Sequence, residues 1–78
     1  GQGAGEGTLA YMPPEQRAGA PAHPSMDVFA FGTAMNEILD HAATEPPPAL
    51  RELALSCLHA DPKQRPTSDW LSKRLRAL

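Results

Sequence analysis

The first residues that could carry chemistry are four glycines at alternate positions, Gly1, Gly3, Gly5 and Gly7. Glycine-rich turns hold phosphate groups because their backbone N–H groups can approach the phosphate closely. The spacing here matches neither the dinucleotide-binding fingerprint nor the P-loop, and the strand that both motifs require is not found. We therefore expect a flexible loop rather than a phosphate site.

Few residues of this chain could support thiol or metal chemistry. The chain has one cysteine, Cys57, which excludes an internal disulfide, and no cluster of metal ligands is apparent. Cys57 lies on an apolar helical face, so core packing is the expected role of its side chain. A single cysteine of this kind is typical of a reducing compartment, and we expect a cytoplasmic protein.

A long helix over residues 25–41 is the element expected to position everything else. Ser25 is a favourable N-cap, Asp27 places negative charge in the first turn, and His41 closes the last turn. Its apolar residues follow the spacing of a buried stripe. These residues are Val28, Phe31, Met35, Ile38 and Leu39.

A helix this apolar belongs in a protein interior, but 78 residues offer little material to cover it. We therefore expect the face that carries Val28, Phe31, Ala34, Met35 and Ile38 to be covered only in part. The covering side chains are expected to be Leu53, Cys57, Trp70 and Leu71.

Prolines mark the start of two further helices. Pro14 suits the first position of a short helix, and Pro48 suits the same position after a linker over residues 42–48. An amphipathic pattern follows Pro48. Its apolar members are Leu50, Leu53, Ala54, Cys57 and Leu58.

The second of these helices should end before Asp61 and Pro62, because proline disfavours helix in the residue before it. Residues 63–66 are expected to form a loop, and Thr67 is a plausible N-cap for a last amphipathic helix. No alternating strand pattern is present, so the predicted fold class is all-α.

The charge is uneven although the formal net charge is only −2. Residues 63–78 contain five basic residues against Asp69 alone. A basic end is compatible with a nucleic-acid interface, but cations in the last turn of a helix also stabilise its dipole, and we favour that interpretation. We therefore expect no nucleic-acid partner. No apolar run approaches 18 residues, so no membrane segment is expected either.

Three motifs in order resemble a protein kinase. Residues 7–15 read G-T-L-A-Y-M-P-P-E and look like the end of an activation segment, G-T-x-x-Y-M-A-P-E, with Pro13 in place of alanine. Residues 27–32 read D-V-F-A-F-G and are similar to the start of kinase helix F. Residues 58–67 read L-H-A-D-P-K-Q-R-P-T and resemble the L-x-x-D-P-x-x-R-P-T near the end of the domain. Gln16 after the P-P-E motif resembles bacterial serine/threonine kinases.

The resemblance implies a partial kinase C-lobe. Residues 1–24 would be the end of the activation segment with the P-P-E loop, and residues 25–78 would be the helical part of one incomplete domain. Glu15 would form a buried ion pair with Arg65, for which the planar guanidinium is suited. Asp27 would anchor the catalytic loop through hydrogen bonds. Without the family context, Glu15 and Arg65 are equally compatible with solvated positions, and Asp27 is an ordinary acid in the first turn of a helix.

The resemblance also implies residues that position a protein substrate. Thr8 would help to hold the hydroxyl group to be phosphorylated, and Leu9, Tyr11 and Met12 would shape the pocket for the next substrate residue. Glu37 matches a position that can meet a basic substrate residue, although a solvated acid is equally compatible.

The departures from the family are large. The glycine-rich loop, the strand lysine, and the H-R-D and D-F-G motifs that phosphoryl transfer requires are absent from this sequence. ATP and Mg²⁺ are therefore implied only for a complete kinase, and this segment alone is expected to be inactive. The link after the central helix has about seven residues, whereas a full kinase has several tens.

Two hypotheses follow. In the first, the chain is a C-terminal segment of a serine/threonine kinase that depends on the missing N-lobe and catalytic loop. In the second, it is a kinase-derived helical module that only binds, with its apolar helix covered by a protein partner. A reading frame upstream with intact V-A-I-K, H-R-D and D-F-G motifs would favour the enzyme.

Overall fold

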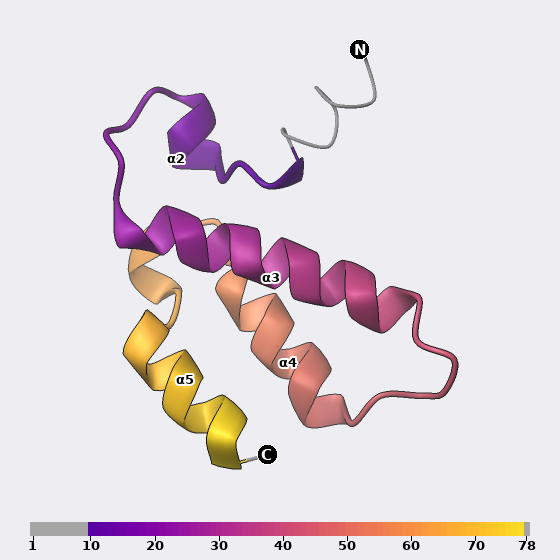
Figure 1. Ribbon diagram of the computed structural model, residues 1–78. Coiled ribbons are helices and arrows are strands. Elements are labelled where there is room, and N and C mark those ends of the chain that lie inside the picture. Colours follow the sequence, from indigo (N-terminus) through magenta and orange to yellow (C-terminus); the bar gives the residue numbers. More distant parts are fainter. Residues whose placement is uncertain (1–9, 78) are drawn as a thin grey trace.

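The computed structural model describes residues 10–77, and within that range every regular element is a helix (Figure 1). The predicted all-α class is therefore confirmed for the described residues. The elements are α2 (Pro14–Arg17), α3 (Pro24–Asp40), α4 (Pro48–Cys57), the 3-10 helix η1 (Pro62–Gln64) and α5 (Ser68–Ala77). The expectations for Thr8 and Leu9 lie outside the described residues.

Prolines start four of these five helices, because a fixed φ near −65° and a missing N–H both suit the first helical position. The predicted starts at Pro14 and Pro48 are confirmed. The central helix also starts at a proline, Pro24, so the prediction of Ser25 as its N-cap is wrong. The N-cap is His23, whose ring Nδ1 accepts a hydrogen bond from the Ser25 N–H at 3.1 Å.

Helix α4 ends at Cys57, before Asp61 and Pro62 as predicted. The segment that follows it differs from the prediction in one respect. Part of the expected loop is the short helix η1, which the Asp61 carboxylate caps by accepting the Lys63 N–H at 3.0 Å. Thr67 does cap α5, since its Oγ1 accepts the Trp70 N–H at 3.1 Å.

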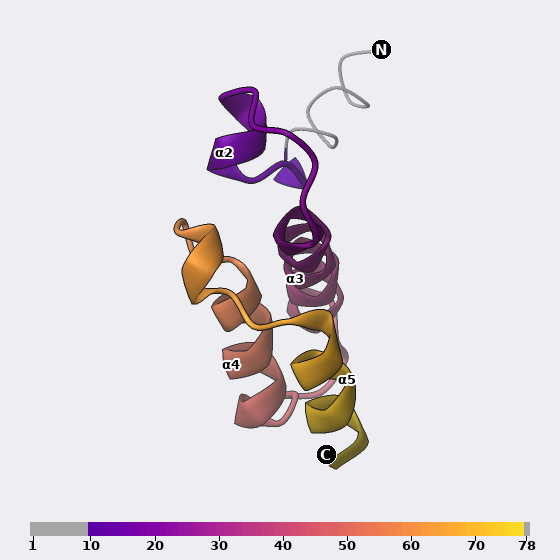
Figure 2. The same ribbon diagram turned by 90° about the vertical axis from the view of Figure 1, so that its left-hand side faces the viewer.

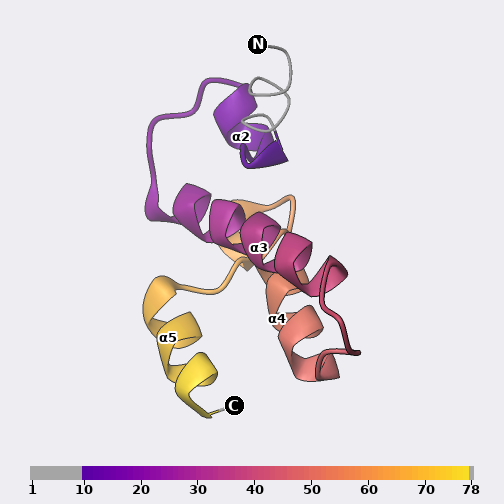
Figure 3. The same ribbon diagram turned by 45° about the vertical axis from the view of Figure 1, so that its right-hand side comes forward.

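The helices are arranged on two sides of α3. Helix α2 lies on one side, and α4 and α5 lie on the opposite side, as the three views of the ribbon agree (Figures 1, 2 and 3). The core is small and lies between α3, α4 and α5. Its buried members are Val28, Leu53, Cys57 and Leu71, with Leu75 partly buried beside them. The expected core role of Cys57 is confirmed.

Helices α3 and α4 are in close contact at Gly32. A Cβ atom at this position would lie 2.6 Å from the Cβ of Cys57 and 3.0 Å from the carbonyl oxygen of Ala54. Helix α4 can approach α3 to this distance only because Gly32 has no side chain.

The apolar face of α3 is covered only in part, as expected. Val28 is 3% exposed, whereas Phe31 is 38% and Ile38 is 70% exposed. Val28 and Phe31 line a groove of about 270 Å³ whose other wall is α5. Trp70 does not line this groove; it is half-exposed and lines a hollow with Ser56 of α4.

Replacing Gly32 by alanine tests the contact between α3 and α4. Alanine favours a helix by about 1 kcal/mol over glycine, but overpacking a core contact costs about 1–3 kcal/mol. Because the nearest atoms belong to a backbone carbonyl and a Cβ, which cannot swing away, we expect Gly32→Ala to lower the thermal midpoint. The control Ser72→Ala, on the exposed part of α5, should change the thermal midpoint little. A Gly32→Ala chain that is more stable than the wild type would show that α4 does not pack tightly against Gly32.

Candidate functional site

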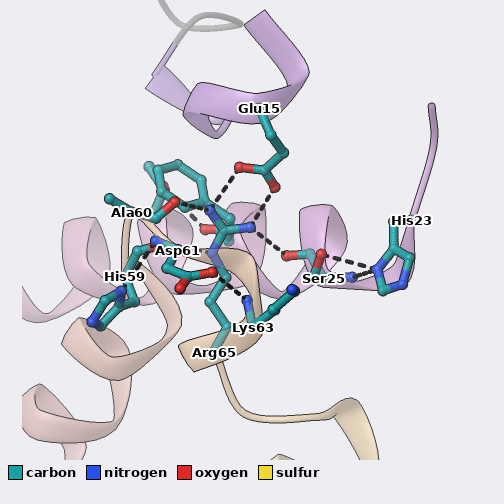
Figure 4. Close-up of polar contacts among 10 residues, drawn as sticks. Glu15, His23, Ser25, His59, Ala60, Asp61, Lys63 and Arg65 are labelled. Atoms are coloured by element: carbon teal, nitrogen blue, oxygen red, sulfur yellow. Dashed lines mark hydrogen bonds and ion pairs between the residues drawn. The ribbon is translucent and has the colours of Figure 1, made fainter. Parts of the chain in front are cut away.

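A buried arginine, Arg65, joins two segments that are fifty residues apart in the sequence. The side chain of Arg65 has no exposed surface, and that of Glu15 is 19% exposed. Arg65 Nη1 donates to Glu15 Oε2 at 2.6 Å, and Nη2 donates to Oε1 at 2.9 Å (Figure 4). The two parallel hydrogen bonds form the bidentate arrangement that makes an arginine–carboxylate pair both strong and directional. The ion pair expected between Glu15 and Arg65 is present.

Backbone carbonyls accept the remaining hydrogen bonds of the guanidinium. Arg65 Nε donates to the carbonyl oxygen of His59 at 2.8 Å, and Nη1 donates to that of Ser25 at 3.2 Å. Nη2 also lies 3.4 Å from the carbonyl oxygen of Ala60. The guanidinium carbon lies 4.9 Å from the centre of the Phe29 ring, within the range of a cation–π contact. A buried charge is tolerated when it is paired and hydrogen-bonded in this way.

Local structure sets the positions of the two partners. Glu15 lies in the first turn of α2, just after the proline that starts the helix. Arg65 follows η1 directly in an extended conformation, with φ −78° and ψ 146°. Because η1 is a single turn, the chain reverses between His59 and Arg65, and the arginine side chain can reach the carbonyl groups that come before the turn.

The chain before α2 contacts the middle of α3. The hydroxyl of Tyr11 donates to Glu37 Oε2 at 2.8 Å, and the carbonyl oxygen of Ala10 accepts from the Thr33 hydroxyl at 3.3 Å. The Glu37 carboxylate raises the pKa of Tyr11, because it accepts the phenolic hydrogen bond. Met12, which follows Tyr11 in the sequence, is half-buried. The structure therefore brings Tyr11 and Glu37 together.

The other predicted site residue, Asp27, lies exposed in the first turn of α3. It lines a shallow hollow with Gln16, His23 and Met26. The ring of Phe29 and the carbonyl groups of Ser25 and His59 are partners of Arg65 that were not predicted from the sequence. Every residue has a backbone carbonyl group, so residue types do not indicate which carbonyl groups accept hydrogen bonds from Arg65.

The arrangement is suited to holding chain segments in place. Arginine stays protonated in proteins, and the Arg65 guanidinium lowers the pKa of Glu15, which keeps that carboxyl group ionised near neutral pH. Among residues 10–77, no group of three histidine, cysteine or acidic side chains lies close enough to hold a metal ion. No helix in the same range is long and apolar enough to cross a membrane.

Removing the arginine should unfold the chain. Breaking one partner of a buried ion pair costs about 3–5 kcal/mol, because the other charge is left unpaired. We expect Arg65→Ala to lose the cooperative thermal transition seen by circular dichroism. Arg76→Ala, which removes an exposed arginine of α5, should leave it nearly unchanged, and equal midpoints for the two variants would mean that the pair contributes nothing.

Acid should weaken the same pair. The pKa of Glu15 is lowered from its ordinary value of 4.5, so its stabilising effect is complete above that value and is lost as the pH falls through the lower, folded-state pKa. The difference in thermal midpoint between the wild type and Glu15→Gln should be constant from about pH 7 to pH 5 and should shrink below pH 4.5. A difference that persists unchanged at about pH 3 would contradict the ionic contribution of Glu15.

Comparisons with protein-family models, with curated proteins and with solved structures found no match to this chain.

Proposed function

We propose that this chain is the helical part of a serine/threonine protein kinase C-lobe. The observation that carries the proposal is the buried pair of Glu15 and Arg65, which are fifty residues apart in the sequence. Glu15 ends the motif that resembles an activation segment, and Arg65 is the arginine of the motif that resembles the end of the domain. Residues from the two motifs therefore meet through a bidentate contact, which supports the proposal.

The proposed role of the chain is to position a protein substrate. The hydrogen bonds from Tyr11 to Glu37 and from Thr33 to Ala10 hold residues 10–12 against α3. Residues there would shape the pocket for the side chain that follows the phosphorylated hydroxyl. In this arrangement Glu37 is engaged by Tyr11, so a basic substrate residue would have to share the carboxylate.

The residues present do not fit ATP and Mg²⁺. The chain has only two lysines, and Lys73 is paired with Asp69 at 3.2 Å on the exposed side of α5. The described residues also lack a cluster of carboxylates for the metal. The nucleotide and its metal would therefore be held by other parts of a complete kinase. A cytoplasmic location is proposed with this function, since kinase substrates and ATP occur there and Cys57 is a free thiol.

A second candidate is a helical module that binds a protein without catalysis. The observation in its favour is the exposed apolar surface of α3 at Phe31 and Ile38, of which Phe31 also lines the groove between α3 and α5. Apolar surface of this kind marks an interface in many soluble proteins.

A chimera tests the first candidate against the second. Residues 7–78 would replace the matching segment of an active bacterial serine/threonine kinase, and phosphorylation of a protein substrate would be measured together with ATP binding by calorimetry. We expect phosphorylation within about tenfold of the parent kinase, a loss of about 1.4 kcal/mol or less. The same chimera with Glu15→Gln should lose much more, because the Arg65 charge is then left without its partner.

The matched control is the chimera with Arg76→Ala, which removes a solvent-exposed arginine of α5. A chimera that folds and binds ATP normally but does not phosphorylate would contradict the kinase proposal and favour the binding module. A chimera whose activity is unaffected by Glu15→Gln would remove the observation on which the proposal depends.

A further inference from the structure

One face of α3 remains accessible to solvent. Its side chains follow the spacing of a single helical face, i, i+4, i+7, i+11 and i+14. Phe31 is 38% and Ile38 is 70% exposed, and Ala34 between them is half-buried. Exposed polar residues stand at the two ends of this face. We call the five residues the open stripe: Asp27, Phe31, Ala34, Ile38 and His41.

The packing of the other segments leaves the open stripe uncovered. Helix α4 contacts α3 at Gly32, and the chain before α2 is hydrogen-bonded to Thr33 and Glu37. Helix α5 shares the core with Val28. These contacts use the sides of α3 that flank or oppose the open stripe. Ile38 therefore keeps most of its surface exposed, although it belongs to the same helix as the core.

The open stripe is self-complementary about Ala34. Asp27 lies seven residues before Ala34, and His41 lies seven residues after it. Phe31 lies three residues before Ala34, and Ile38 lies four residues after it. Two antiparallel copies of α3 that cross at Ala34 therefore bring the Phe31 of each copy beside the partner's Ile38. A pairing of this kind, in which both copies use the same surface, is the isologous interface of a two-fold dimer.

We propose that the open stripe binds a second copy of this chain through an antiparallel pair of α3 helices. The small side chain of Ala34 lets the two helix backbones approach closely where they cross. The partner's Ile38 then covers Phe31, at the edge of the groove that Phe31 and Leu75 line between α3 and α5. The inference rests on the second candidate function, the binding module, and names its partner.

The polar ends of the open stripe favour the antiparallel orientation. Asp27 of one copy meets the partner's His41, whose imidazole N–H can donate to the carboxylate whether or not the ring is protonated. The positive N-terminal end of one helix also lies beside the negative C-terminal end of the other. A parallel pair would bring two Asp27 carboxylates together, and like charges repel. An unrelated apolar partner could cover Phe31 and Ile38, but it would not require complementary polar groups at equal distances from Ala34.

Sedimentation of the 78-residue chain tests whether it dimerises. One helix face from each copy forms the interface, so we expect a dissociation constant of about 10–100 µM. The mass should rise from 8.3 kDa toward twice that value as the chain concentration increases from about 1 µM to about 500 µM.

Ile38→Glu should weaken the dimer by about tenfold or more, because it places two carboxylates in the apolar part of the interface. The matched control is Leu55→Glu, since Leu55 is an apolar residue of α4 that is 53% exposed and lies outside the open stripe. Leu55→Glu should dimerise like the wild type, and circular dichroism should show that both variants are folded.

Cross-linking tests the antiparallel register. In a two-fold pair that crosses at Ala34, this position faces itself, so Ala34→Cys should form a disulfide-linked dimer under mild oxidation. Ala49→Cys, at an exposed position of α4, should cross-link much more slowly. Cys57 has no exposed surface and is present in both variants, so it does not affect the comparison. Equal rates for the two variants would overturn the antiparallel pairing.

A chain that stays monomeric over the whole concentration range would overturn the proposal, as would equal dimerisation of Ile38→Glu and Leu55→Glu. An apolar fluorescent dye then separates this failure from that of the binding module. A monomer that binds the dye still exposes its apolar face, so the module would bind a different partner. A monomer that does not bind the dye would remove the binding-module candidate as well.

Discussion

The guanidinium of Arg65 sets the constraint that the rest of the structure satisfies. A cation without exposed surface must be paired and hydrogen-bonded, or burying it would cost several kcal/mol. Its partners come from α2, from the first turn of α3 and from the segment before η1. The side chain of Arg65 therefore links three segments that are distant from one another in the sequence.

The core itself is narrow, and this is why the polar site matters so much. Helices α3 and α4 pack closely at Gly32, but α5 adds only Leu71 and the partly buried Leu75. Phe31 and Ile38 of α3 are exposed, whereas Val28 of α3 is buried in the core, so the same helix contributes both to the core and to the exposed apolar surface.

Much of the helical framework could be predicted, because prolines and apolar periodicity act locally. The starts at Pro14 and Pro48 followed from the preference of proline for the first helical position, and the same rule applied to Pro24 would have found the start of α3. Ser25 was predicted as the N-cap instead, because serine is a more common N-cap than histidine.

The tertiary contacts were harder to predict, since no local pattern links residues fifty apart. The pairing of Glu15 with Arg65 came from the family resemblance, and composition or spacing would not have indicated it. The carbonyl acceptors and the ring of Phe29 were not foreseen, because they depend on how the backbone turns around η1. The partial exposure of α3 was foreseen from the length of the chain.

The separation of Glu15 and Arg65 along the chain has a consequence for the order of folding. Closing a flexible loop of fifty residues costs about 3.5 kcal/mol by ideal-chain scaling, against about 1.7 kcal/mol for the seven residues that join α3 to α4. The α3–α4 hairpin can therefore form early from local contacts, and the ion pair can form only after α2 and the residue that follows η1 have been brought together. We expect the pair to be absent from the folding transition state, so that it slows the unfolding of the chain and has little effect on its rate of folding.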